Sequence, residues 1–134
     1  MTRYLICFLC IVSIPAFAQS ENVPQDDRWV EVFHDDEGGF WVDSETLRFV
    51  GDNLFEAWVW STWFVDKDEG GDWWRMMALS QFDCEQKRRA PISIHSEING
   101  EFGSPTNVDD LRWRYVIPGT VDEAVLDFVC STSE

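Results

Sequence analysis

Positive charge is scarce in this sequence. Its 134 residues include 10 lysines and arginines against 25 aspartates and glutamates, which gives a formal net charge of −15. This imbalance excludes nucleic acids and anionic lipid surfaces as partners, because both repel a strongly acidic protein. It favours a basic protein or a cation as partner, and it also serves to keep an exported chain soluble.

Long apolar runs are scarce as well. The run from Leu5 to Ile14 is too short to span a bilayer. Arg3 precedes it, and the small-x-small sequence of residues 16–18 follows it. This pattern predicts a signal peptide, residues 1–18, that is cleaved after Ala18. Since no other segment is apolar enough to cross a membrane, we expect an exported protein, periplasmic or secreted, with no membrane-spanning segment in its mature form.

Cysteine is limited to four residues, and cleavage of the signal would halve that number. Cys7 and Cys10 leave with the signal, whereas Cys84 and Cys130 remain in a compartment where disulfides persist. We therefore predict a Cys84–Cys130 disulfide. The two residues are too far apart for a redox Cys-x-x-Cys motif. Loss of the signal, with its single arginine, would leave 9 basic and 25 acidic residues, a net charge of −16.

The remaining chain predicts one domain that consists mostly of strands. Residues 19–28 are polar and predict a mobile N-terminus, so the domain comprises residues 29–134. Alternating apolar residues predict strands at Trp29–His34, Phe40–Asp43, Leu54–Val65, Trp73–Phe82, Ile92–Ile98, Glu101–Phe102 and Leu111–Ile117. Asn99-Gly100 predicts a hairpin turn, and Asp43 to Thr46 predicts the cap of a helical turn ending near Phe49. Leu54–Val65 is apolar on both faces, which is typical of a central strand.

A single helix is predicted at the C-terminal end. Thr120 and Glu123 form a capping box, and an apolar stripe follows at helical spacing: Val121, Ala124, Val125, Phe128 and Val129. Because Cys130 would fall opposite this stripe, we expect the helix to end or tighten at about Val129. The predicted fold is therefore α+β, a meander of about six antiparallel strands with one C-terminal helix packed on a face and one disulfide.

Several segments carry a family resemblance. Phe40-Trp41-Val42-Asp43, the pair Asp83-Cys84 and the segment from Trp113 to Thr120, followed by Cys130, are similar to motifs of the bacterial surface-adhesin protein E-like domain family. The similarity covers nearly all of residues 29–130. It implies an antiparallel sheet with a packed helix, the same disulfide, and dimerisation in some members. The family is named for an outer-surface protein that binds host matrix proteins, so the resemblance implies a host-matrix-like protein partner.

Two acidic loops are candidate cation sites. In a simple meander both lie at the same end of the sheet, which would bring seven carboxylates together: Asp35, Asp36, Glu37, Asp66, Asp68, Glu69 and Asp72. Such a group could attract a hard cation such as calcium. Neither loop has the ligand spacing of a calcium-binding hand, however, and solvated hairpin tips are the ordinary alternative. We assign no specific metal site and no cofactor.

Tryptophans are the other candidate site. Five of them cluster on adjacent predicted strands: Trp58, Trp60, Trp63, Trp73 and Trp74. Packing in the core is the ordinary explanation for such residues. One short helix covers only part of one sheet face, so we expect a ligand, a partner or a second copy of the chain to cover some of this aromatic surface.

The sequence contains no recognisable catalytic constellation. His34 and His95 are isolated, and no nucleophile, base or metal ligands share a motif with either of them. The one basic cluster, residues 87–89, is explained by a solvated turn, and the alternative is a site for an anionic partner. We therefore expect a non-enzymatic exported binding domain that engages a protein. A homodimer is an alternative way to cover the aromatic surface. The alternative is a periplasmic domain that binds a cation or a small ligand through the acidic loops or the aromatic face.

Overall fold

The computed structural model describes residues 23–65, 71–98 and 101–132. The predicted signal peptide, the Asn99-Gly100 turn and most of the second acidic loop lie outside these residues. The elements of the described part are β1 (Trp29–His34), β2 (Gly38–Asp43), β3 (Arg48–Gly51), β4 (Leu54–Val65), β5 (Asp72–Asp83), β6 (Arg88–Ile98), β7 (Glu101–Phe102), β8 (Thr106–Asn107), β9 (Arg114–Tyr115) and α1 (Val121–Ser131).

The strands form one antiparallel sheet with a meander as its main path. The order along that path is β1-β2-β4-β5-β6-β7, which confirms the expected antiparallel meander. Three short strands lie off this path: β3 pairs with β4, and β8 and β9 pair with β6. The described sheet therefore has nine strands, more than the estimate of about six, because the strands off the main path have only two to four residues and leave little periodic pattern in a sequence.

Two local predictions were wrong. The expected helical turn ending near Phe49 is instead a turn followed by strand β3, whose Phe49 pairs with Phe55 of β4. The expected strand Leu111–Ile117 shrinks to Arg114–Tyr115, which pairs with the first two residues of β6. In both cases pairing with a neighbouring strand of the sheet decided the structure, and local propensity did not.

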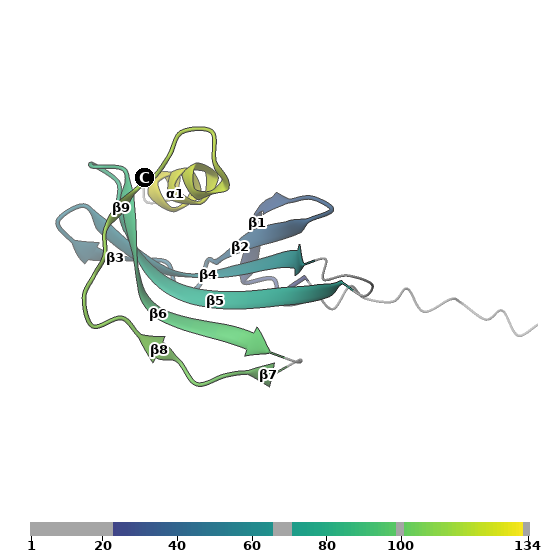
Figure 1. Ribbon diagram of the computed structural model, residues 1–134. Coiled ribbons are helices and arrows are strands. Elements are labelled where there is room, and N and C mark those ends of the chain that lie inside the picture. Colours follow the sequence, from purple (N-terminus) through teal and green to yellow (C-terminus); the bar gives the residue numbers. More distant parts are fainter. Residues whose placement is uncertain (1–22, 66–70, 99–100, 133–134) are drawn as a thin grey trace, which may run out of the picture.

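Strand β4 is central, as expected from its apolar residues. It pairs with β5 over its whole length, from Leu54 opposite Asp83 to Val65 opposite Asp72. On its other side it pairs with β2 and β3. A register shift between β5 and β6 near Leu79 marks a bulge, and bulges increase bending and twist. Figure 1 shows β5 and β6 bending strongly, with α1 lying on the inner side of the bend.

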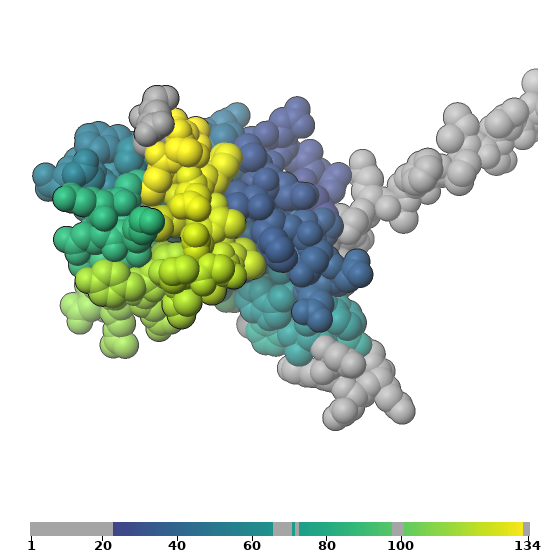
Figure 2. Space-filling model, turned by 90° about the horizontal axis from the view of Figure 1, so that it is seen from above, coloured from purple at the N-terminus to yellow at the C-terminus, as the bar shows by residue number. Residues whose placement is uncertain are grey.

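The core lies between α1 and one face of the sheet. It consists of four buried strand residues, Val42, Ala57, Val59 and Phe82, packed against three buried helix residues, Val125, Leu126 and Val129. We call this side of the sheet the helix face and the opposite side the outer face. In Figure 2, seen from above, α1 (yellow) lies across the helix face, with the earlier strands beside it in purple and blue.

The disulfide joins Cys84 and Cys130 as predicted, with Cα atoms 5.7 Å apart. The expected end of the helix was wrong, because α1 continues through Cys130 to Ser131. The predicted stripe omitted Leu126, which is buried in the core. Cys130 lies about 40° around the helix from Leu126, since the two are four residues apart. The cysteine therefore flanks the buried side of α1 and reaches Cys84 without any break in the helix.

The predicted capping box is also wrong in detail. Thr120 is the N-cap residue, but its side chain caps no helix N–H. Its hydroxyl instead donates to the carbonyl of Ile117 at 2.6 Å, and the Glu123 carboxylate accepts from the N–H of Gly119, also at 2.6 Å. Both bonds reach back into the Pro-Gly turn and fix the direction in which the chain enters α1.

Candidate binding surface

The five predicted tryptophans divide between the two faces of the sheet. Trp58 and Trp60 alternate with the core residues of β4 and therefore lie on the outer face. Trp73 pairs with Phe64 and shares that face, whereas Trp74 pairs with Trp63 on the helix face. A single aromatic patch made of all five residues does not exist.

The outer face carries a layer of aromatic contacts within the chain. Trp60 contacts Trp29 edge to face at a centroid distance of 5.5 Å and Phe102 at 5.8 Å. Trp58 meets His95 at 5.3 Å. Trp41, on the same face, is 2 % exposed, and its ring lies so close to Gly39 that a Cβ there would be 2.3 Å from it. These contacts cover much of the face that we expected a second molecule to cover. The homodimer stays a prediction.

Exposed aromatic side chains gather instead where β4 ends. Trp63 is 37 % exposed and Phe64 is 44 % exposed. Phe33 of β1 is 37 % exposed. It lies two strands away from β4, because β1 pairs with β2 (Phe33 opposite Phe40) and β2 pairs with β4 (Gly38 opposite Trp63). Phe33 and Trp63 lie on the helix face and Phe64 lies on the outer face, so the three residues flank both sides of this end of the sheet. We call them the aromatic tip. The ring of Phe64 also packs 5.5 Å from that of Trp73, which fixes its position.

The first acidic loop borders the aromatic tip. The N–H of Phe64 donates to the carbonyl of Glu37 at 2.8 Å, so residues 35–37 lie directly beside the end of β4. The Asp35 carboxylate accepts from the N–H groups of Glu37 and Gly38, at 2.9 and 3.0 Å, and thereby shapes the turn. Asp36 and Glu37 are exposed, and no described residue forms an ion pair with either of them.

The second acidic loop cannot be placed beside the first. Asp66, Asp68 and Glu69 lie outside the described residues, as does the side chain of Asp72. Within residues 23–65, 71–98 and 101–132, no group of three or more histidines, cysteines, aspartates or glutamates has an arrangement that could hold a metal ion. Cation binding by the acidic loops stays a prediction.

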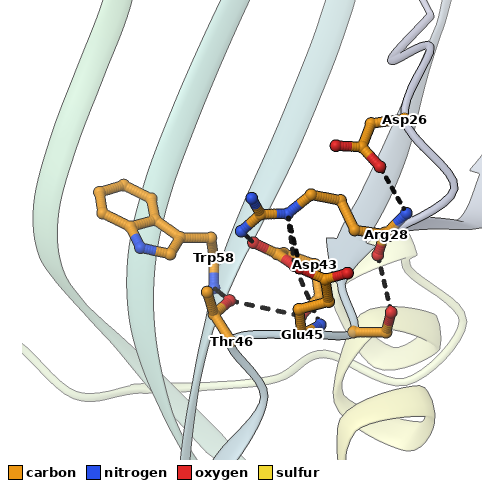
Figure 3. A network of polar contacts seen from close by, with 7 residues as sticks. Asp26, Arg28, Asp43, Glu45, Thr46 and Trp58 are labelled. Atoms are coloured by element: carbon orange, nitrogen blue, oxygen red, sulfur yellow. Dashed lines mark hydrogen bonds and ion pairs between the residues drawn. The ribbon is translucent and has the colours of Figure 1, made fainter.

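Four buried carboxylates are held by arginines: Asp43, Glu56, Asp83 and Glu97. The pKa is lowered in two of them, Asp43 and Asp83. Burial alone would raise the pKa of Asp43, but hydrogen bonds from the Arg28 side chain and the Glu45 N–H, with the charge of Arg28, hold that pKa below its ordinary value of 3.8. Figure 3 shows this network, in which the N–H of Arg28 also donates a hydrogen bond to the carboxylate of Asp26. The ion pair fixes the start of β1 to the end of β2.

The second carboxylate with a lowered pKa lies at the end of β5. Burial would raise the pKa of Asp83, whereas the Gln86 N–H and the Arg88 side chain lower it, and the net pKa falls below its ordinary value. Asp83 thus anchors the turn that leads from Cys84 into β6. The carboxylates of both aspartates therefore stabilise the fold through contacts within the chain.

The predicted basic cluster at residues 87–89 does not form one charged patch. Arg88 binds Asp83 and stacks over Trp113, 4.7 Å from the ring. Arg89 pairs with Asp122 of α1. Only Lys87 of the three has no described ion pair. The histidines are separate too: His34 lies beside Trp41 and Glu31, and His95 beside Trp58.

Phe33 and Phe64 are not among the predicted aromatic residues, which are all tryptophans. Each residue is the last but one of a strand that leads into an acidic glycine loop, and that shared position is a signal visible in the sequence. The Arg28–Asp43 ion pair was not predicted either, since Arg28 belongs to the segment expected to be a mobile N-terminus.

Comparison with known proteins identifies the family. The family model of surface-adhesin protein E matches residues 29–131. The chain belongs to this family. Two solved structures of Haemophilus influenzae protein E have the same fold: one, of crystal form II, has a TM-score of 0.53 and the other has a TM-score of 0.52, each with 11 % sequence identity. Each match covers 81 % of this chain, with 93 % and 89 % of the respective protein E chain. No curated protein is significantly similar in sequence.

Membership of the surface-adhesin protein E family confirms the resemblance derived from the motifs. It implies an exported or surface protein, and it points to binding rather than catalysis. No helix of the described part of the chain is long and apolar enough to cross a bilayer. At 11 % identity the protein E structures support the fold, and the binding surface of this chain has to be argued from its own residues.

Proposed function

We propose that this protein is an exported, non-enzymatic binding domain that engages a basic protein through the aromatic tip and the adjoining acidic loop. The observation that carries the proposal is the position of Phe33, Trp63 and Phe64, exposed at one end of the sheet beside Asp36 and Glu37. Aromatic anchors supply most of the energy at protein interfaces. Membership of an adhesin family supports a protein partner.

The charge of the loop supports a basic partner in particular. Asp36 and Glu37 have no described ion pair, so a lysine or arginine from a partner would meet carboxylates that are free to accept it. The net charge of −16 expected for the mature chain would attract such a partner from a distance and speed its association. The aromatic tip then supplies contact area at short range.

A panel of purified extracellular-matrix proteins tests this proposal. Basic and acidic members of similar size are immobilised, and binding of the protein is measured by surface plasmon resonance between 50 and 500 mM salt, a range that takes the screening length from above to below about 10 Å. We expect binding to a basic member that weakens steeply with salt. Binding to acidic members alone, or binding that does not respond to salt, would contradict the proposal.

A charge variant makes the panel specific to the loop. D36N/E37Q removes two carboxylates and leaves Asp35, which shapes the turn, in place. We expect slower association with the basic partner, because complementary charge acts mainly on the association rate. D109N/D110N removes two exposed aspartates outside this surface and is the matched control. Equal effects of the two variants would attribute binding to net charge rather than to the loop.

A further inference from the structure

A hollow of about 360 Å³ opens on the helix face, between the sheet and the segment that leads into α1. Its apolar lining includes Phe40 of β2, Met76 of β5 and Ile94 of β6. On the other side it is bounded by Arg112 and Arg114. We call this hollow the arginine pocket. Its volume lies at the lower end of the range for small-molecule sites, about 300–1,000 Å³.

Two cations of the arginine pocket are unneutralised. Arg112 and Arg114 are exposed, and within the described part of the chain neither guanidinium forms a hydrogen bond or an ion pair. The other described arginines are all paired, Arg28, Arg48, Arg75, Arg88 and Arg89 each with a carboxylate. In a chain with 25 acidic residues, two free arginines at one hollow are an exception that charge balance does not explain.

The surrounding contacts hold the two arginines in place. Trp113, which lies between them in the chain, packs under Arg88, and the N–H of Val116 donates to the carbonyl of Lys87 at 2.9 Å. Arg114 itself pairs with Arg89 in the β6–β9 ladder. At the rim, Asp122 is occupied by Arg89 and is therefore not available to neutralise either free arginine.

We propose that the arginine pocket binds a small amphiphilic carboxylate. The carboxylate head is held by Arg112 and Arg114, whose planar guanidinium groups match its two oxygens. The apolar body lies against Phe40, Met76 and Ile94 and leaves water as it does so. This site uses none of the side chains of the aromatic tip, and the proposal does not depend on the proposed protein partner.

Calorimetric titration with octanoate tests the proposal, with octanol and acetate as comparison probes. Octanol has the apolar chain without the charge, and acetate has the charge without the chain. We expect octanoate to bind the purified protein and both comparison probes to bind at least about tenfold more weakly, because each lacks one of the two interactions. No binding of octanoate, or equal binding of either comparison probe, would overturn the proposal.

Variants assign the binding to the arginine pocket. R112Q and R114Q each remove one exposed cation, and each is expected to weaken octanoate binding about tenfold, the effect of losing one charge-assisted hydrogen bond. R48Q removes one exposed cation on the opposite face and is the matched control, expected to bind as the wild type does. Thermal melting establishes that all three variants are folded. Unchanged affinity in R112Q and R114Q, or an equal loss in R48Q, would contradict the assignment.

Discussion

The rings of Trp60 and Phe102 meet edge to face, 5.8 Å apart, although β5 and β6 run between their two strands. The contact ties β7, a strand of two residues, to the middle of β4. Together with the Trp29–Trp60 contact, it gives the outer face a cover that belongs to the chain itself. Among the aromatic residues of β4, those available to a partner are therefore Trp63 and Phe64 at its end.

Phe102→Ala tests the role of this contact. We expect the free energy of unfolding to fall by about 1–2 kcal/mol, because the substitution removes an edge-to-face pair and the apolar area buried with it. Urea denaturation followed by circular dichroism measures the change. Leu111→Ala is the control, since Leu111 is similarly exposed, and we expect a change within about 0.5 kcal/mol. Equal effects of the two substitutions would show that Phe102 adds nothing beyond exposed apolar area.

The disulfide is expected to supply a large share of the stability. C84S/C130S opens a link between residues 46 apart, and the chain-entropy relation gives a loss of about 4 kcal/mol. That loss is comparable to the whole stability of many small domains. The comparison is between oxidised wild type, reduced wild type and the double variant, by thermal melting. A melting temperature that reduction leaves unchanged would contradict this role.

Acid is expected to destabilise the fold through Asp43 and Asp83. The pKa of each is lower in the folded chain than its ordinary value of 3.8. A carboxylate with a lowered pKa stabilises the fold above the unfolded-state pKa, and that stabilisation is lost as the pH falls through the folded-state pKa. We therefore expect the contribution of these two groups to be constant above about pH 5 and to decline below about pH 4.

D43N separates this effect from general acid denaturation. The variant keeps the shape of Asp43 but cannot form an ion pair with Arg28, so we expect a lower melting temperature at pH 7 and a shallower fall between pH 5 and pH 3. D52N is the control, because Asp52 is exposed in a turn with φ of 51°, a conformation that asparagine tolerates. An acid profile of D43N parallel to that of the wild type would contradict the assignment.

Strong local patterns allowed much of the sheet to be predicted from sequence. The bounds of β1 and β4 are those expected, because both segments alternate with few interruptions and end at acidic glycine or Gly-Asp-Asn turns. The disulfide followed from counting the cysteines left after the signal. The strand bounds depend on residues that are close in the chain. The disulfide depends on the number of cysteines, because two cysteines within one chain can form only one pair.

Features that depend on pairing between strands or on packing against the sheet were not predicted. Strands β3 and β9 exist because they pair with β4 and β6, and their own residues do not require it. The rotation of α1 that buries Leu126 is decided by packing on the sheet. With this rotation Cys130 lies at the flank of the buried side and not opposite it, as the predicted stripe implied. The division of the tryptophans between faces required the β4–β5 register.

The central claim is that the aromatic tip binds a protein partner, and the dissociation constant of W63S/F64S tests it most directly. The partner is the matrix protein that the wild type binds most tightly. F49S is the control, because Phe49 is 62 % exposed and lies far from the aromatic tip. It pairs with Phe55, which is eight residues along β4 from Trp63. Thermal melting first establishes that both variants are folded. We predict that W63S/F64S binds at least about tenfold more weakly while F49S binds as the wild type does. Equal dissociation constants for W63S/F64S and the wild type would contradict the account.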